Sequence, residues 1–291
     1  MAAYLIYRVA SWLVPLLPRA VSYALCDFFG EAAFRVNRAG RMAARANLRH
    51  VYRAWPPNTV VREMFRSAAR NYLDTFIIPS LTPVTIHDWA RVEGMQHLEA
   101  ALAEGRGAIL AGMHLGSAAL AAQVLAMHGW PMRTVVEPIQ PPALFNLISG
   151  YRSARGVQII PLNADAIGRR LIRELRANHV LGLMLDRELS GTGAPIQFFD
   201  APAVLSLGAA TLALATGAAL LPSLVLRDPD GRVRGVIEAP VTIERTGDRD
   251  VDARAFTRRV VERLEYYIAQ APGQWTLFVP VWDRPLESPR C

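Results

Sequence analysis

The sequence predicts an α/β fold, in which a mostly parallel central sheet is wrapped by helices. Short apolar runs alternate with helical patterns along most of the chain. One of these runs, 108–111, lies close to a glycine at each end and is typical of a buried parallel strand. Strands that alternate with helices favour a parallel sheet covered on both faces. The 291 residues, of which 52% are hydrophobic and 20% charged, suffice for one large domain or two small ones.

Hydrophobic periodicity, together with glycine and proline breaks, predicts the successive helices and strands. Residues 57–104 look helical, with prolines at 56–57 and between 79 and 83 as interruptions. The uncharged run 201–226 is long enough to suggest a membrane span, but Gly217 and Pro222 divide it into a helix and a strand. Beyond residue 107, strands are expected at 108–111, 133–136, 157–161, 180–185, 220–226, 233–237 and 275–282, and helices at 117–128, 143–155, 166–177, 205–216 and 251–269.

Residues 1–56 are predicted to form an N-terminal amphipathic, arginine-rich helical segment that associates with a membrane, followed by an α/β domain over 57–291. Arg8 and Arg19 interrupt the apolar stretch, and the uncharged run 9–18 is shorter than the ~20 residues that a membrane span needs. No small-residue cleavage site follows a basic start, so a secretory signal is not expected. The helices would lie in the membrane interface. The alternative is an ordinary helical hairpin that packs against the domain.

Charge favours an anionic partner. The net charge is +7, and the isoelectric point is about 10.0. An anionic membrane surface would attract each nearby arginine by ~1 kcal/mol, although a merely solvated basic face is the alternative. No aromatic residues interleave with the arginines and no DNA-binding motif is present, so no nucleic-acid partner is expected. Six arginines recur at helical spacing with no acid between Glu31 and Glu63: Arg35, Arg38, Arg41, Arg45, Arg49 and Arg53.

His114 is the leading candidate for chemistry. It falls where the run 108–111 ends and a helical pattern begins. Open α/β sheets place ligands at that point, because strand ends and helix N-terminal N–H groups converge there. An imidazole could act as a general base, and N–H groups near Gly116 could stabilise an oxyanion. The alternative is a histidine satisfied by a backbone carbonyl.

Several other kinds of site are not supported. The chain has no Gly-x-Ser-x-Gly elbow of a serine hydrolase, and the glycines at 105 and 107 are too few for a dinucleotide fingerprint. The histidines and acids are not grouped at metal-ligand spacings, so no metal is expected. The chain contains no lysine, which excludes a lysine nucleophile. Cys26 and Cys291 form no disulfide or metal pattern.

Several short motifs along the chain occur in the order and spacing of a known protein family. They are Asn47-Leu-Arg-His50, His114-Leu-Gly116, Arg152 ahead of Gly156, Asp186-Arg187-Glu188, Phe198-Phe199-Asp200-Ala-Pro202, the tract 215–222 and Gln274-Trp275. In this order and spacing they resemble the lysophospholipid acyltransferase superfamily, in its branch of bacterial lipid A and phosphatidylinositol mannoside acyltransferases. The resemblance covers nearly the whole chain. The tracts 186–188 and 215–222 look closer to the mannoside enzymes.

The resemblance implies a reaction and its partners. The family transfers a fatty acyl group from an acyl-CoA or acyl-carrier-protein thioester to a lipid hydroxyl. The expected acceptor is a glycolipid, such as a phosphatidylinositol mannoside or a lipid A precursor. The thioester is a co-substrate, and no other cofactor is expected. The protein would be peripheral, at the cytoplasmic face of the bacterial inner membrane, where the thioester is found.

The sequence departs from the family pattern beside His114. The family usually places an acid five positions after the histidine to orient the imidazole, and here that residue is Ala119. Ser117 stands where relatives often have Asn. In one interpretation Glu188, which follows the strand 180–185, takes the orienting role, as the matching glutamate is thought to do in the mannoside branch. In the alternative, the protein is a degenerate member that binds lipid without transferring acyl groups.

The remaining candidates, with Gly116 and Ser117, would bind substrate. Glu137 follows the strand 133–136 and could bind acceptor hydroxyls or pair with Arg152, the alternative being a surface acid. Arg152 would face a phosphate of donor or acceptor, or form a helix-surface ion pair. Asp186 and Arg187 would form an ion pair that holds the loop of Glu188, more readily than they would contact substrate. Trp275 and Trp282 are expected to be core or interface anchors.

Overall fold

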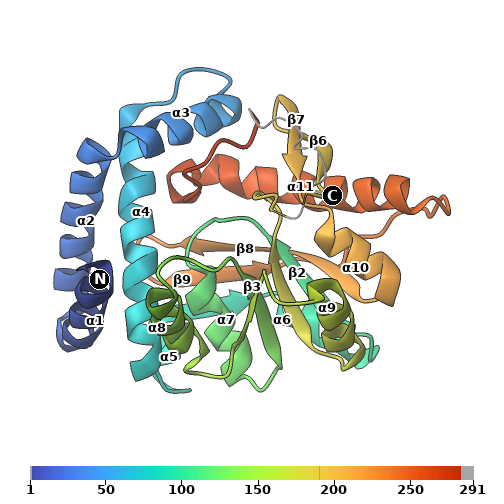
Figure 1. Cartoon of the computed structure of the whole chain (residues 1–291), viewed down its shortest axis with the longest axis horizontal. Helices are drawn as coiled ribbons and strands as arrows, with labels where there is room; N and C mark the ends of the chain where they lie inside the picture. The colour runs from blue at the N-terminus through green and yellow to red at the C-terminus, as the bar shows by residue number, and fades with distance from the viewer. Residues whose placement is uncertain (1, 190, 283–291) are drawn as a thin grey trace.

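A seven-stranded, mostly parallel sheet lies at the centre of the computed structural model, which describes residues 2–189 and 191–282 (Figure 1). The strand order is β1-β9-β8-β2-β5-β3-β4. Strands β8, β2, β5, β3 and β4 run parallel, while β9 pairs antiparallel with β8 and parallel with β1. The strands are β1 (Ala90–Glu93), β2 (Ala108–Gly112), β3 (Met132–Val136), β4 (Gln158–Pro161), β5 (Val180–Met184), β8 (Ala219–Arg227) and β9 (Val233–Ile237).

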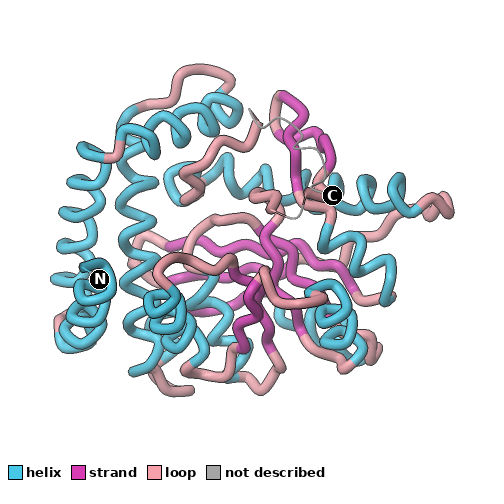
Figure 2. The backbone as a smooth tube through the Cα atoms, viewed as in Figure 1, coloured by secondary structure: helices cyan, strands magenta, loops and turns pink. Residues whose placement is uncertain are grey.

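Helices cover both faces of this sheet, as the prediction requires (Figure 2). The helices are α1 (Ala2–Leu13), α2 (Arg19–Val36), α3 (Arg38–Tyr52), α4 (Asn58–Ile77), α5 (Ile86–Trp89), α6 (Met95–Ala103), α7 (Ala118–Met127), α8 (Pro142–Ser153), α9 (Ile167–Arg176), α10 (Gly208–Thr216) and α11 (Arg249–Gln270). All five residues of β2 are buried. Ile109 and Ala111 pack in the core cluster that contains residues of α9, α10 and α11, and Ala108 and Leu110 pack in the cluster with residues of α6 and α7. This central strand is apolar throughout because both of its faces are covered.

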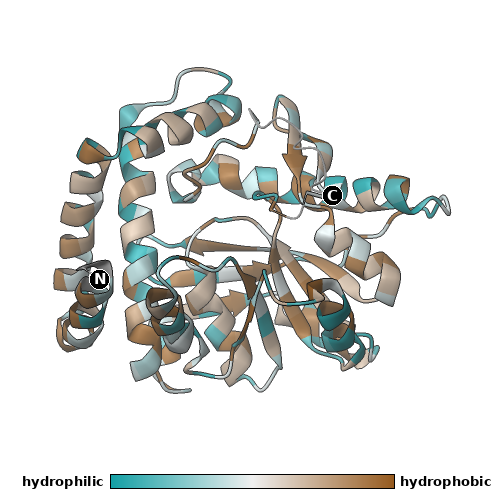
Figure 3. Ribbon diagram, in the orientation of Figure 1, coloured by the Kyte–Doolittle hydropathy of each residue, from teal (hydrophilic) through white to brown (hydrophobic). Residues whose placement is uncertain are grey.

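The N-terminal helices α1 and α2 lie beside α4, at one edge of the molecule (Figure 1). Figure 3 shows that they carry many apolar residues. Trp12 is 71% exposed and Phe28 is 66% exposed, so part of this apolar surface faces outward. No helix in the described part of the chain is long and apolar enough to cross a membrane.

The six arginines of the predicted basic face, which run from the end of α2 to the residue after α3, have two kinds of environment. Arg41 donates to the carbonyls of Phe34 and Arg35 at the end of α2, and Arg45 donates to Asn58. The arginines left exposed are Arg35, Arg38, Arg49 and Arg53. The basic face predicted from the spacing therefore contains four exposed arginines and two that also join neighbouring segments.

Three elements differ from the predictions. Strand β1 lies within the region expected to be helical. An antiparallel hairpin, β6 (Ala194–Phe198) and β7 (Ala201–Leu205), precedes α10, so the expected helix 205–216 begins later. The expected strand 275–282 is wrong: a 3-10 turn, Pro272–Gln274, leads into an irregular segment with one bridge between Leu115 and Trp275. The division into 1–56 and 57–291 stays a prediction; its boundary falls in the loop before α4.

Candidate active site

His114 and Asp186 meet because of the strand register. Gly112, the last residue of β2, is paired with Met184, the last residue of β5. His114 and Asp186 each lie two residues beyond this pair, and parallel neighbours end at the same edge of the sheet. The register therefore brings the two side chains together at the carboxyl edge, immediately before α7.

The two side chains form a tight hydrogen-bonded pair. His114 Nδ1 lies 2.7 Å from Asp186 Oδ1. The backbone N–H of His114 donates to Asp186 Oδ2 at 2.9 Å, and the indole N–H of Trp275 donates to the same oxygen at 2.8 Å. The Asp186 side chain is completely buried, whereas 37% of the His114 side chain is exposed. Because Nδ1 is occupied by Asp186, Nε2 is the nitrogen that remains for a substrate.

The electrostatics favour the charged pair. Burial alone would lower the pKa of His114, but the Asp186 carboxylate and its hydrogen bond outweigh burial, so the pKa is raised above its ordinary value. Burial alone would raise the pKa of Asp186, but His114 and the bonds from Trp275 and the His114 backbone hold it below its ordinary value. An imidazole oriented in this way, with a buried carboxylate to stabilise its cation, can act as a general base.

The prediction that Glu188 orients His114 is wrong, because the carboxylate on Nδ1 is that of Asp186. Glu188 lies two residues further from the strand end, and its side chain packs against Gly193. The prediction that Asp186 and Arg187 form a structural ion pair is wrong as well. Arg187 pairs with Glu137 at the end of β3, so Glu137 is also not the partner of Arg152.

The guanidinium of Arg152 lies close enough to His114 to influence its pKa, and no described residue gives it a carboxylate partner. It lies in the last turn of α8 and is half-buried. Its Nε is buried and makes no hydrogen bond within residues 2–189 and 191–282, and the structure forms no ion pair to its guanidinium in that part of the chain. Burial lowers the pKa of Arg152, and its charge in turn opposes protonation of His114. A half-buried guanidinium of this kind is suited to an anionic group of a ligand.

Tyr7 and Tyr72 extend the site toward the N-terminal helices, and the sequence did not single them out. Their rings are in edge-to-face contact, with centroids 5.7 Å apart. Both hydroxyls interact with the charge of Arg152. Burial, followed by the influence of Tyr72, raises the pKa of Tyr7. Gln123, also missed, donates from its buried amide to the carbonyl of Arg152 and so ties α7 to α8.

Gly116 is required by the loop that follows His114. Its φ is +62°, and a Cβ there would lie 2.3 Å from the carbonyl oxygen of Val225. Its N–H donates to the carbonyl of Gln274 at 3.0 Å, so an oxyanion site near Gly116 would need other N–H groups of the loop and stays a prediction. Ser117 precedes α7, and its buried hydroxyl makes no hydrogen bond to the residues that the structure describes. It is therefore a polar group still available beside the loop.

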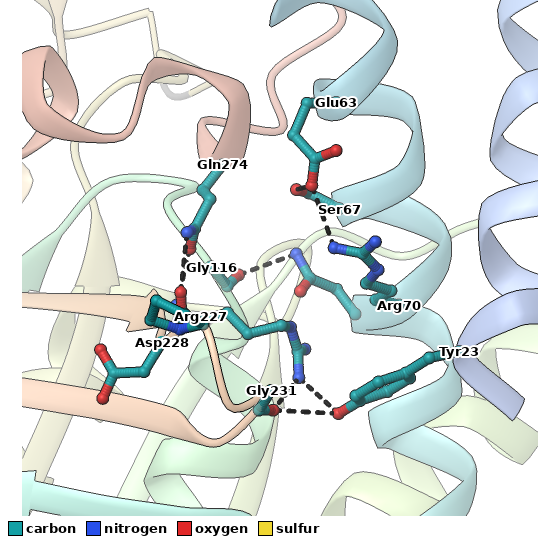
Figure 4. Close-up of a pocket in the computed structure, with 11 residues that line it drawn as sticks. Tyr23, Glu63, Ser67, Arg70, Gly116, Arg227, Asp228, Gly231 and Gln274 are labelled. Carbon is teal, nitrogen blue, oxygen red and sulfur yellow. Dashed lines mark hydrogen bonds and ion pairs between the residues drawn. The ribbon is translucent and has the colours of Figure 1, made fainter. Parts of the chain in front are cut away.

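A polar cavity of about 380 Å³, with Gly116 in its lining, lies between α4 and the turn that joins β8 to β9 (Figure 4). Its charged groups are paired with one another or with neighbours: Arg70 with Asp27 and Glu63, and Arg227 with Asp74. Asn71, also in the lining, donates to the carbonyl of Gly116 at 2.9 Å. This hydrogen bond ties α4 to the loop that follows His114. Among the described residues no cluster of His, Cys, Asp or Glu is suited to a metal ion.

Comparison with known proteins identifies the family to which the chain belongs. The family model of bacterial lipid A biosynthesis acyltransferases matches residues 1–284. The chain belongs to this family. It is 30% identical to a phosphatidylinositol mannoside acyltransferase of Mycolicibacterium smegmatis, over 97% of this chain and 92% of that protein. It is 31% identical to the Mycobacterium tuberculosis protein of the same name, over 97% and 89%, and 26% identical to a lipid A biosynthesis lauroyltransferase of Escherichia coli, over 91% and 86%.

Membership in the acyltransferase family confirms the resemblance drawn from the motifs. The structure shows where the chain departs from the family pattern at Ala119. Ala119 lies in the first turn of α7 and packs against apolar residues. The acid that contacts the imidazole comes from the end of β5 instead of from α7.

Proposed function

We propose that the protein transfers a fatty acyl group from an acyl thioester, acyl-CoA or acyl carrier protein, to a hydroxyl of a glycolipid. The observation that carries this proposal is the buried Asp186 carboxylate on Nδ1 of His114, in a chain of the acyltransferase family. The lipid-binding alternative was based on the alanine at 119. Asp186 supplies the acid that position lacks, so the geometry favours the catalytic role.

The reaction follows from the pair. His114 Nε2 takes the proton of the acceptor hydroxyl as its oxygen attacks the thioester carbonyl carbon. Asp186 stabilises the imidazolium that forms. The tetrahedral intermediate collapses, the carbon–sulfur bond breaks, and the leaving thiolate takes the proton back from His114. The products are an ester and a free thiol, and the base is regenerated.

For the acceptor we propose a phosphatidylinositol mannoside, because the two mannoside acyltransferases are the more similar relatives. Arg152 suits the lipid phosphate, since it is a half-buried cation without a carboxylate partner in the described chain. The pair of Arg187 and Glu137 offers a donor and an acceptor to sugar hydroxyls at the same sheet edge. Ser117 and Gly116 would line the approach to His114.

We also propose that the protein works on the membrane surface, at the cytoplasmic face where the thioester is available. The exposed apolar side chains of α1 and α2 would enter the interface. Four exposed arginines, at the end of α2, on α3 and directly after α3, would lie against anionic lipid. Tyr7 joins α1 to the surroundings of Arg152, so the bilayer and the site would be adjacent.

The test is a competition between acceptors. Purified protein is given radiolabelled palmitoyl-CoA, or the acyl-carrier-protein thioester, with equal amounts of phosphatidylinositol mannoside and a lipid A precursor. His114→Ala is run beside His87→Ala, an exposed histidine on α5 that serves as the matched control. We expect label in the mannoside with wild type and His87→Ala, and none with His114→Ala. Label in the lipid A precursor would overturn the proposal that the acceptor is a phosphatidylinositol mannoside. Full labelling by His114→Ala would overturn the proposal that His114 is the general base.

A further inference from the structure

Three segments that the sequence singled out, and that the reaction itself does not use, lie together beside the catalytic pair. They are residues 47–50 on α3, 198–202 in the β6–β7 hairpin, and 274–275. We propose that Trp275 is a positioning residue that holds the Asp186 carboxylate toward His114, and that the other two segments hold Trp275. This inference rests on the proposed function for its kinetic test.

The indole acts on one oxygen of the carboxylate. Trp275 is completely buried, and its N–H donates to Asp186 Oδ2 at 2.8 Å. The backbone N–H of His114 donates to the same oxygen at 2.9 Å. Oδ1 is thereby left for the imidazole. The carboxylate cannot rotate away from His114 without breaking both bonds in a buried environment, where an unmade bond costs most.

The backbone around Trp275 is joined to the backbone around His114. Gly116 N–H donates to the Gln274 carbonyl at 3.0 Å, and Thr276 N–H donates to the His114 carbonyl at 2.8 Å. Figure 4 shows Gln274 and Gly116 near one another in the cavity wall. These two hydrogen bonds fix the backbone beside His114 relative to the backbone beside Trp275. A shift of either segment would therefore displace the other.

A buried asparagine anchors the segment that follows. Asn47 on α3 is completely buried. Its amide donates to the carbonyls of Leu277 and Val279, at 3.2 and 2.9 Å. Its carbonyl oxygen accepts from the N–H of Val281 at 3.0 Å. The Asn47 side chain thus makes three hydrogen bonds to the backbone of this irregular segment.

Aromatic side chains from α3, the β6–β7 hairpin and the C-terminal segment pack next to the ring of Trp275. Trp282 stacks between His50 and Phe198, with centroid distances of 4.1 and 5.0 Å. Phe198 meets Trp275 edge-to-face at 5.8 Å. His50 Nδ1 lies 2.6 Å from Asp200 Oδ1, which joins α3 to the hairpin. The ring of Trp275 therefore has little room to move, and its N–H keeps its direction.

A purely structural tryptophan would act through its ring, whereas a positioning residue acts through its N–H. Trp275→Phe keeps an aromatic ring, removes the donor to Asp186 and makes the buried side chain smaller. Trp282→Phe is the matched control, since it also removes one indole N–H, which donates to the Ala201 carbonyl and not to Asp186. Any loss common to both variants is a packing effect.

We expect Trp275→Phe to lower kcat about tenfold with KM changed less than twofold, because a bond to a charged group is lost in the transition state. Trp282→Phe should keep kcat within about twofold. The NMR signal of the hydrogen-bonded Nδ1 proton of His114 should broaden or vanish in Trp275→Phe and persist in Trp282→Phe. Equal kcat in the two variants, or a rise in KM alone, would overturn the proposal.

A measurement on the wild type covers the case in which Trp275→Phe does not fold. The indole ¹H–¹⁵N signal of Trp275 should exchange slowly with solvent and shift with the same midpoint as the His114 ring. An indole signal whose chemical shift does not change as His114 titrates would overturn the proposal. If the wild type transferred no acyl group from either thioester, the proposed function would fail, and the two NMR measurements would still decide the role of Trp275.

Discussion

Replacing Asp186 by asparagine should abolish turnover through the wrong tautomer of His114. The indole N–H of Trp275 and the backbone N–H of His114 both point at the Oδ2 position. They would hold the carbonyl oxygen of the new amide there, so its NH₂ group would face Nδ1 of His114. Nδ1 must then accept, the ring proton moves to Nε2, and Nε2 can no longer take a proton from the acceptor.

The expected loss is about 10³–10⁴ in kcat, as for comparable changes in other His–Asp systems. It corresponds to about 4–5.5 kcal/mol of transition-state stabilisation. The assay is the initial rate of palmitate transfer at saturating acceptor, with the thermal midpoint as the measure of folding. Asp165→Asn, an exposed acid in the loop before α9, is the control. Glu188→Gln should lose less than tenfold. An Asp186→Asn protein within tenfold of wild type, beside a Glu188→Gln protein reduced a hundredfold, would show that Glu188 and not Asp186 orients His114.

Four further results are expected. The kcat/KM profile should rise with pH to a midpoint above the ordinary histidine value of ~6.5, because the pKa of His114 is raised and only its neutral form is a base; a midpoint below 6 would contradict this. Arg152→Gln should raise KM for an anionic acceptor about tenfold without lowering the thermal midpoint, since a half-buried cation with no acid partner in the described chain does not stabilise the fold; a drop of several degrees would count against it. Gly116→Ala should cost about 1–3 kcal/mol in the free energy of unfolding, because of its φ of +62° and the carbonyl of Val225; an unchanged denaturation midpoint would be inconsistent. Phe28→Ser should weaken sedimentation with anionic vesicles about fivefold with folding intact, because this side chain is 66% exposed; unaltered binding would argue against membrane docking by α2.

The sequence predicted the central sheet and the place of its histidine well. The strand before His114 is uniformly apolar because both of its faces are covered, and the pattern carries that information directly. The expected division of the long uncharged run into a helix and a strand is confirmed at Gly217, which ends α10, whereas Pro222 lies within β8 and does not mark the boundary. The hairpin β6–β7 was missed because part of it lies in the same run, where no charge marks the alternation of its faces.

The partner of His114 could not be chosen from the sequence, because the choice depends on strand register. Asp186 and Glu188 both follow the strand, and only the pairing of Gly112 with Met184 shows that Asp186 is level with His114. Trp275 was expected to be an anchor in a strand. The structure keeps it buried but turns its N–H to Asp186, a contact between residues 89 positions apart that no local pattern reveals.

The mass spectrum of the lipid recovered after incubation with palmitoyl-CoA and phosphatidylinositol mannoside tests the proposed acyl transfer directly. We predict that wild type adds one palmitoyl group to the acceptor as an ester and releases free CoA in equal amount. His114→Ala should leave both substrates unchanged. Acceptor that stays unmodified with wild type, when either palmitoyl-CoA or the acyl-carrier-protein thioester is supplied, would contradict acyl transfer to this acceptor and favour a protein that only binds lipid.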